Sequence, residues 1–253
     1  MAHIRDIIAD LDALLEPAAY SDFGPNGLQV PGAGEVSRVV TGVSANRELI
    51  ERAIEQRAQL LLVHHGLFWD FHPTGLTPVV AARLRLLFRH DVNLAAYHLP
   101  LDGHAVVGNN AQLADRLGCA GHEPFGVVGS RPIGRVGTFS GDGVPAPELF
   151  ARVERVTGRS PLVFDAGPAL VKTIGIVSGG AAKSLPEAVA AGLDAFLTGE
   201  PSEHVMGDAR EAGIHFVAAG HYATETFGVR ALGERLAHTF GVDHAFVDVP
   251  NPI

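Results

Sequence analysis

The chain has a single cysteine, Cys119, which excludes an internal disulfide and any zinc site built from several cysteines. No apolar run is long enough to cross a bilayer, because Gly or His interrupts each of them. Lysine is scarce as well: 17 Arg and two Lys are scattered through a chain of net charge −9, without the basic cluster of a nucleic-acid or membrane surface. We therefore expect a soluble protein of the reducing cytoplasm, with neither a membrane nor nucleic acid as its partner.

The chain is rich in apolar residues and in histidine. Its 253 residues are 47% hydrophobic, enough for one large or two small α/β domains. Residues 1–17 place Ile and Leu at helical spacing and carry charges every few positions, which predicts an amphipathic helix and neither a signal peptide nor a membrane span. There are 13 histidines, and their positions decide what they indicate.

One structural pattern occurs twice along the chain. Residues 38–63 have the pattern of strand, loop, helix and buried strand, and residues 172–198 repeat it. A short apolar strand that ends near a histidine follows each copy, in HDVNLAAYHLPLD and in AGIHFVAAGHYATE, and the helical segments AQLADRLG and RALGERLA come next. We interpret this as an internal duplication of an α/β unit, with halves at 1–125 and 126–253 that divide within the Gly-rich stretch 120–145.

Polar residues gather where the predicted strands end. His64 and His65 directly follow the apolar run LLLV and precede Gly66, which allows a sharp turn. Reactive groups of α/β sheets collect at the carboxyl ends of strands. Adjacent strand residues point to opposite faces, so both imidazoles reach one site only if the strand ends and bends there. The alternative is one histidine that caps the strand and another that packs in the core.

His221 and Glu225 form a second candidate pair. One helical turn or a tight loop across the three intervening residues would bring them together; the alternative is a surface histidine beside a solvated carboxylate. The duplication places Asp102, four residues beyond His98, at the position equivalent to Glu225. Three imidazoles and two carboxylates would then form a dinuclear site that favours zinc, iron or manganese over calcium or magnesium. Two such ions, about 3.5–4 Å apart, polarise a substrate oxygen and activate water, so hydrolysis is the expected chemistry.

Three further residues are candidates for catalysis. His98 would orient a ligand or carry a proton, or it is a hydrogen-bonded core histidine. Glu200 and His204, in TGEPSEH, would orient substrate or act as acid and base. The alternative for Glu200 is a glutamate at a helix start. The segment SGGAAKS lacks the spacing of a Walker motif and predicts no nucleotide-binding P-loop.

The chain resembles the Nif-three-like dinuclear metal centre family, whose bacterial members are often labelled GTP cyclohydrolase I type 2 homologues. The segments that carry the resemblance extend over nearly the whole chain: DFGPNGLQV, LLVHHGLFW, AAYHLPLD, LTGEPSEH, AAGHYATE and FVDVPNP. The resemblance implies two intertwined, similar α/β halves that assemble as a ring-shaped homohexamer around a cavity. Some relatives carry an extra domain between the halves, and this chain has no room for one.

The resemblance also implies a ligand set and a chemistry. His65 and Asp102 would hold one metal, His64 and His221 the other, and Glu225 would bridge both. The family label implies attack of water on the imidazole ring of GTP with release of formate. Because the sequence has no motif that reads guanine or a triphosphate, we expect more broadly a metal-dependent hydrolase of a nucleotide or related small molecule. The alternative is a non-catalytic metal-binding or scaffold protein, and the acidic charge disfavours nucleic acid in the ring cavity.

Overall fold

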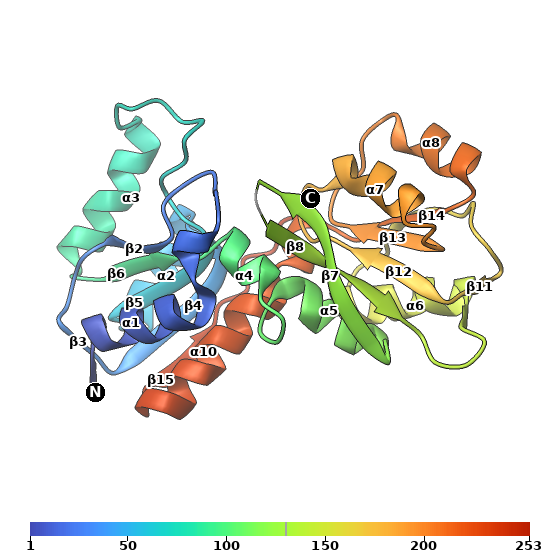
Figure 1. The fold of residues 1–253 in the computed structure, drawn as a ribbon. Helices are drawn as coiled ribbons and strands as arrows, with labels where there is room; N and C mark the ends of the chain where they lie inside the picture. The colour runs from blue at the N-terminus through green and yellow to red at the C-terminus, as the bar shows by residue number, and fades with distance from the viewer. Residues whose placement is uncertain (130) are drawn as a thin grey trace. The chain divides into compact units, whose positions relative to one another are not determined.

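The computed structural model describes residues 1–129 and 131–253 (Figure 1). The chain forms two compact units: unit 1 contains Met1–Leu101 and Gly228–Val249, and unit 2 contains Asp102–Phe227 and Pro250–Ile253. Each unit has helices packed on a mixed β-sheet, which confirms the predicted α/β class. The predicted halves 1–125 and 126–253 divide the chain at a different place, and the internal duplication stays a prediction.

Unit 1 contains a five-stranded sheet in the order β15–β4–β5–β6–β2. Neighbouring strands are parallel from β15 to β6, and β2 is antiparallel at the edge. A separate antiparallel pair joins β1 to β3. The strands are β1 (Ala2–His3), β2 (Gly27–Val30), β3 (Glu35–Val36), β4 (Arg38–Ser44), β5 (Leu60–His65), β6 (Asn93–Ala96) and β15 (Asp243–Phe246). The helices are α1 (Ile4–Leu15), the 3-10 turn η1 (Pro17–Ala19), α2 (Arg47–Glu55), α3 (Pro78–Arg89) and two that contain the points where the chain changes unit, α4 (Leu99–Gly103) and α10 (Thr226–Phe240).

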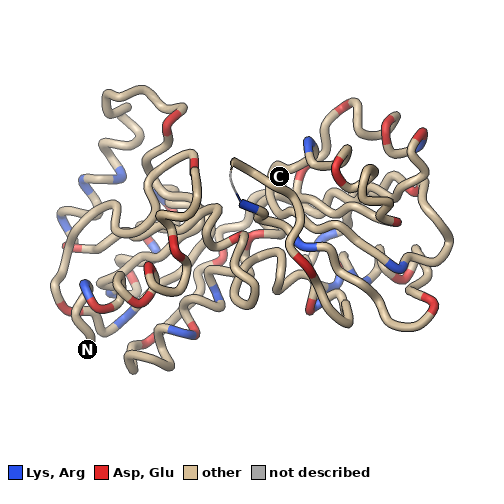
Figure 2. Tube along the Cα trace, viewed as in Figure 1, with Lys and Arg blue, Asp and Glu red and all other residues tan. Residues whose placement is uncertain are grey.

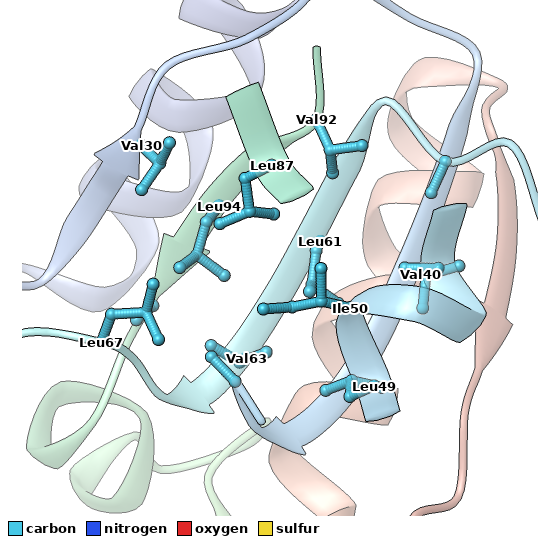
Figure 3. Close-up of a cluster of buried hydrophobic side chains, with 14 of the residues drawn as sticks. Val30, Val40, Leu49, Ile50, Leu61, Val63, Leu67, Leu87, Val92 and Leu94 are labelled. Atoms are coloured by element: carbon cyan, nitrogen blue, oxygen red, sulfur yellow. The ribbon is translucent and has the colours of Figure 1, made fainter. Parts of the chain in front are cut away.

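Helices cover both faces of this sheet because its strands are apolar on both sides. The buried side chains of α2, such as Leu49 and Ile50, pack with Leu61 and Val63 of β5, and Leu87 of α3 belongs to the same cluster (Figure 3). Helices α1 and α10 lie on the other face (Figures 1 and 3). Local sequence sets the helix starts, since the side chains of Asn46 and Thr77 cap α2 and α3 by accepting from backbone N–H groups.

Unit 2 contains a six-stranded sheet in the order β10–β14–β13–β12–β8–β7, in which β12 pairs with β13 and β13 with β14 in parallel and the other neighbouring strands are antiparallel. A two-stranded sheet pairs β9 with β11. The strands are β7 (Gly121–Val128), β8 (Arg131–Thr138), β9 (Val144–Pro145), β10 (Leu162–Phe164), β11 (Leu170–Val171), β12 (Thr173–Ile176), β13 (Ala195–Thr198) and β14 (His215–Ala218). The helices are α5 (Asn109–Leu117), α6 (Ala146–Thr157), η2 (Ala182–Ser184), α7 (Leu185–Ala190), α8 (Val205–Ala212) and α9 (His221–Thr224).

The helices of unit 2 also lie on both faces of its sheet, with α5 and α6 on one side and α7 and α8 on the other (Figure 1). Leu113 of α5 and Leu149 of α6 share a buried cluster with Ile174 and Leu197 of the central strands. Because β12, β13 and β14 are parallel, the loops that follow their carboxyl ends lie at the same edge of the sheet. Charged residues of both signs are spread along the chain in both units (Figure 2).

Most of the predicted elements are confirmed. The amphipathic segment at the start forms α1, and the strands expected at 38 and 172 are β4 and β12. Strand β5 was expected to end at Val63, where its apolar run stops. It continues for two more residues, because His65 still pairs with Ser44 of β4. Among the residues described, no helix is long and apolar enough to cross a membrane.

Candidate metal centre

Three imidazoles form a cluster in unit 1. His64 and His65 occupy the end of β5, and His98 follows the neighbouring strand β6 by two residues. One ring nitrogen from each lies within 4.8 Å of the others. The ring centroids of His64 and His65 are 4.7 Å apart, and that of His98 lies 5.0 Å from His64 and 5.5 Å from His65. The cluster exists because parallel neighbouring strands bring their carboxyl ends to the same edge of the sheet.

Hydrogen bonds orient the two rings at the end of β5. The Nδ1 atom of His64 lies 3.0 Å from the carbonyl oxygen of Tyr97, which can only accept, so Nδ1 carries the proton. The Nδ1 atom of His65 lies 3.0 Å from the hydroxyl oxygen of Ser44. In both rings Nε2 is then the nitrogen suited to bind a metal, the arrangement usual for metal-ligating histidines.

His98 is held by a buried carboxylate. The side chain of Asp22 is 3% exposed, and its Oδ1 lies 2.7 Å from His98 Nδ1. Its second oxygen, Oδ2, accepts hydrogen bonds from the Asn26 amide at 2.8 Å and from the Leu99 N–H at 2.9 Å. Burial alone would raise the pKa of Asp22, but the hydrogen bonds from His98, Asn26 and the Phe23 N–H hold it below the usual value. Asp22 therefore stays ionised and fixes the His98 ring.

A small cavity lies beside these rings. Its volume is about 10 Å³, and its lining includes His64, His98 and Trp69. That volume is close to the space needed by one water molecule. The imidazole cluster therefore has room beside it for a reactant of the size of water.

Unit 2 carries a second cluster, centred on the buried Glu225. Its Oε2 lies 3.2 Å from His221 Nε2. A carboxylate oxygen of the buried Asp102 lies within 4.8 Å of one of Glu225. Glu225 is thus the middle member of three donors. His221 and Glu225 come together as predicted, because His221 begins the single turn α9 and Glu225 directly follows it.

His221 lies between two carboxylates. Its Nδ1 is hydrogen-bonded to Glu200 Oε1, while its Nε2 faces Glu225. Burial alone would lower the pKa of His221, but the two carboxylates raise it to about 9. The interaction with Glu200 repeats the carboxylate–histidine arrangement of Asp22 and His98, so Glu200 orients the His221 ring.

Asp102 is oriented by polar groups of its own unit. Its Oδ1 accepts hydrogen bonds from Asn109 Nδ2 at 2.8 Å and from the Ser178 hydroxyl at 3.1 Å. Ser178 is held in turn, since its backbone N–H donates to Asn110 Oδ1 at 2.7 Å. The carboxylate of Asp102 is therefore fixed in orientation without an ion.

The loop that follows β12 packs closely against Glu225. Gly179 has a φ of +67°, and a Cβ there would collide with the Glu225 carboxylate, so glycine is required on both counts. Its carbonyl oxygen accepts from the Gly199 N–H at 2.8 Å, and its N–H donates to Thr224 Oγ1 at 3.1 Å. The segment SGGAAKS, which has no Walker spacing, contributes here through close backbone packing.

Sequence reasoning placed most of these residues but missed their partners. The five predicted ligands lie in the two clusters, His64 and His65 in unit 1 and Asp102, His221 and Glu225 in unit 2; their binding of metal stays a prediction. His204 is exposed at the start of α8, and its side chain forms no hydrogen bond within the described part of the chain. The partners that sequence reasoning missed are Asp22, Ser44, Asn109 and Ser178. Only Asp22 had a signal, because it opens the segment DFGPNGLQV.

The donor atoms suit a first-row metal. Imidazole nitrogens and carboxylate oxygens bind zinc, iron or manganese well, whereas imidazole is a poor ligand for calcium and magnesium. The rings of both units are oriented through Nδ1, as is usual for histidines that bind a metal through Nε2. The residues of each cluster therefore fit the predicted metal site.

The fold and these clusters define a mixed α/β protein with His, Asp and Glu groups capable of holding metal ions. The chain belongs to the Duf34/NIF3 (NGG1p interacting factor 3) family, whose model matches residues 2–252. It is 44% identical over 250 residues to the GTP cyclohydrolase 1 type 2 homolog of Pseudomonas aeruginosa, covering 98% of each chain. It is 45% identical over 246 residues to the Vibrio cholerae homolog of the same name, covering 96% of each.

Solved structures show the same fold. The protein ybgI, described as of unknown function, matches with a TM-score of 0.92 and 40% identity over 100% of both chains. A protein from Thermus thermophilus, TTHA1606, matches with a TM-score of 0.91 and 35% identity, again over 100% of both. These comparisons confirm the family resemblance drawn from the sequence motifs.

Proposed function

We propose that this chain is a metal-dependent hydrolase that binds two divalent ions through five residues and acts on a nucleotide or a related small molecule. The ligands in the proposal are His64, His65, Asp102, His221 and Glu225, with Glu225 shared by both ions. The observation that carries it is the orientation of the imidazoles in both units, since His64, His65 and His221 each have Nδ1 hydrogen-bonded to an oxygen, the arrangement usual for histidines that bind a metal through Nε2.

Two further observations support a shared ligand. Glu225 is buried and is the middle donor of its cluster, with His221 on one side and Asp102 on the other. Burial of two carboxylates near each other is costly unless cations compensate their charge. Bound ions would supply that compensation, would polarise a substrate oxygen and would acidify water.

The chain's own residues have distinct roles in the proposal. His98, held by Asp22, is the group placed to accept a proton at Nε2 beside the water-sized cavity. Glu200 fixes the ring of His221 by its hydrogen bond at Nδ1. His204 stays a candidate acid or base, in a place exposed to solvent.

Metal analysis and turnover together test this function. Protein reconstituted with manganese, iron or zinc should contain two ions per chain and should hydrolyse some member of a panel of nucleotides and phosphoesters. GTP belongs in the panel, with formate as the product assayed, because the relatives are named GTP cyclohydrolase 1 type 2 homologs. Glu225→Ala should lose both metal and turnover, and Glu203→Ala, at an exposed residue, is the matched control.

The alternative is a non-catalytic metal-binding or scaffold protein. Protein that holds both ions, stays folded and turns over no compound with any of the three metals would favour this alternative and reject the hydrolase. The proposal also includes a cytoplasmic location and a homohexameric ring, carried over from the family resemblance. Light scattering tests the ring, since a mass other than that of six chains would reject it.

A further inference from the structure

A pocket of about 520 Å³ opens in unit 1 between the end of β5 and α3. Residues 67–77 and the first two turns of α3 line it. Its volume lies in the range that holds a drug-sized or mononucleotide-sized ligand. All of its lining residues come from one stretch of chain, so the pocket belongs to unit 1 alone.

Trp69 forms the wall between this pocket and the imidazole cluster. It lines both the large pocket and the water-sized cavity that His64 and His98 line. Its indole meets the His98 ring edge-on, with centroids 5.1 Å apart at 88°, and stacks on Phe71 at 5.6 Å and 18°. A planar ligand in the pocket would therefore lie against an aromatic side chain that contacts His98.

The pocket wall is largely apolar, and Arg83 is the one arginine among its lining residues. Leu76 and Val79 line it and are 61% and 59% exposed, an unusual amount of apolar surface for side chains of this size. Arg83 lines the same pocket, and its Nε is buried without a hydrogen-bond partner. The guanidinium forms no ion pair with any residue in 1–129 or 131–253, and burial lowers its pKa. An anionic group of a ligand would stabilise this cation.

One acidic side chain also lines the pocket. Asp70 is exposed, and its carboxylate forms no hydrogen bond or ion pair with another described residue. A carboxylate accepts hydrogen bonds from amino or hydroxyl groups, which an inorganic anion does not offer. The pocket thus presents an aromatic and apolar wall with the Arg83 guanidinium as a donor for an anion and the Asp70 carboxylate as an acceptor, besides the polar side chains of His72, Thr74 and Thr77. This set suits a heteroaromatic ring with an attached phosphate.

We propose that this pocket binds a mononucleotide-like ligand, with its ring against Trp69 and the apolar wall and its phosphate on Arg83. The inference deepens the proposed function by naming the part of the protein that selects the substrate. Catalysis on that ligand rests on the proposed function, whereas binding in the pocket needs neither metal nor turnover.

Fluorescence of Trp69 measures binding directly, because it is the only tryptophan in the chain. Metal-free protein in chelator is titrated with AMP, with adenosine, which lacks the anion, and with ribose 5-phosphate, which lacks the ring. AMP should change the emission in a saturable way, and the other two should bind at least about tenfold more weakly, because each lacks one of the two contacts.

Two variants locate the site. Arg83→Gln should weaken AMP about tenfold or more and leave adenosine unchanged, since only the phosphate contact is lost. Val79→Glu places a second negative charge on the wall, at an exposed position where folding is not at risk, and should also weaken AMP. Arg85→Gln, exposed on the same helix, is the matched control and should bind AMP like the wild type.

Any of three binding results would overturn the inference: no saturable change with AMP, an equal loss of AMP binding in Arg85→Gln, or a loss of adenosine binding as large as that of AMP in Arg83→Gln. A change in the mass of the assembly in Val79→Glu, with AMP binding intact, would assign the apolar wall to a second copy of the chain and also overturn it. Protein that binds AMP but hydrolyses nothing rejects the proposed function and keeps the pocket.

Discussion

Replacing Asp22 by Asn tests how the imidazole cluster is held. The Asp22 carboxylate receives the Phe23 N–H and His98 on Oδ1, and the Asn26 amide and the Leu99 N–H on Oδ2. Asparagine keeps one of these oxygens and puts an NH₂ group in place of the other, so two of the four donors lose their acceptor and face another donor.

The expected cost follows from those two donors. A buried donor left unsatisfied costs about 1–3 kcal/mol, so the variant should lose about 3 kcal/mol of unfolding free energy. For a chain of this size the melting temperature should fall by about 6–12 °C. Urea unfolding and thermal melting of metal-free protein measure both quantities. Asp142→Asn, at an exposed carboxylate, is the control and should change stability by less than about 0.5 kcal/mol.

The dependence on pH follows from the lowered pKa of Asp22. A carboxylate whose pKa is lower in the folded state stabilises the fold above its unfolded pKa of 3.8 and loses that contribution as pH falls through the folded value. The difference in unfolding free energy between wild type and Asp22→Asn should therefore have its full size at pH 7 and should become smaller below pH 3.8. A variant as stable as the Asp142→Asn control at pH 7 would refute the reasoning.

Three further predictions concern the orientation of the donors. In metal-free protein kept in chelator, the charged His221 should stabilise the fold fully below pH 6.5 and lose that contribution as pH rises through about 9. The difference in unfolding free energy between wild type and His221→Gln, measured by urea unfolding, should therefore disappear over that range. Gly179→Ala should destabilise by about 1–3 kcal/mol in thermal melts and lower the metal content, because the added Cβ meets the Glu225 carboxylate at a positive φ; an unchanged metal content would contradict this. Ser44→Ala should weaken metal binding about tenfold in chelator competition, because His65 loses its orienting partner, and unaltered affinity would count against that role.

Local patterns predicted the elements that depend on neighbouring residues. Apolar runs located β4 and β5, and helical spacing of apolar residues located α2. The spacing of His221 and Glu225 was sufficient to predict that they come together over one turn. The extension of β5 through His65 was missed because the apolar run stops at Val63, whereas the pairing with Ser44 does not depend on apolarity.

Contacts between distant residues could not be read from the sequence. Asp22 and His98 are 76 residues apart, and Ser178 and Asp102 are equally far from each other, so no local pattern marks either hydrogen bond. Which segments of the chain make up each unit could not be predicted, for the same reason. No local pattern shows that β15 pairs with β4, whose residues lie far from it in the sequence.

The pairing of β15 with β4 has a consequence for how this protein is made. The strands of the unit 2 sheet all lie within residues 121–218, so a growing chain can complete that sheet while still attached to the ribosome. Unit 1 receives its edge strand and most of α10 only from residues 228–246, which are synthesised after every strand of the unit 2 sheet. The histidines at the tip of β5 are thus synthesised before the unit 2 sheet, but the unit that carries them is completed after it.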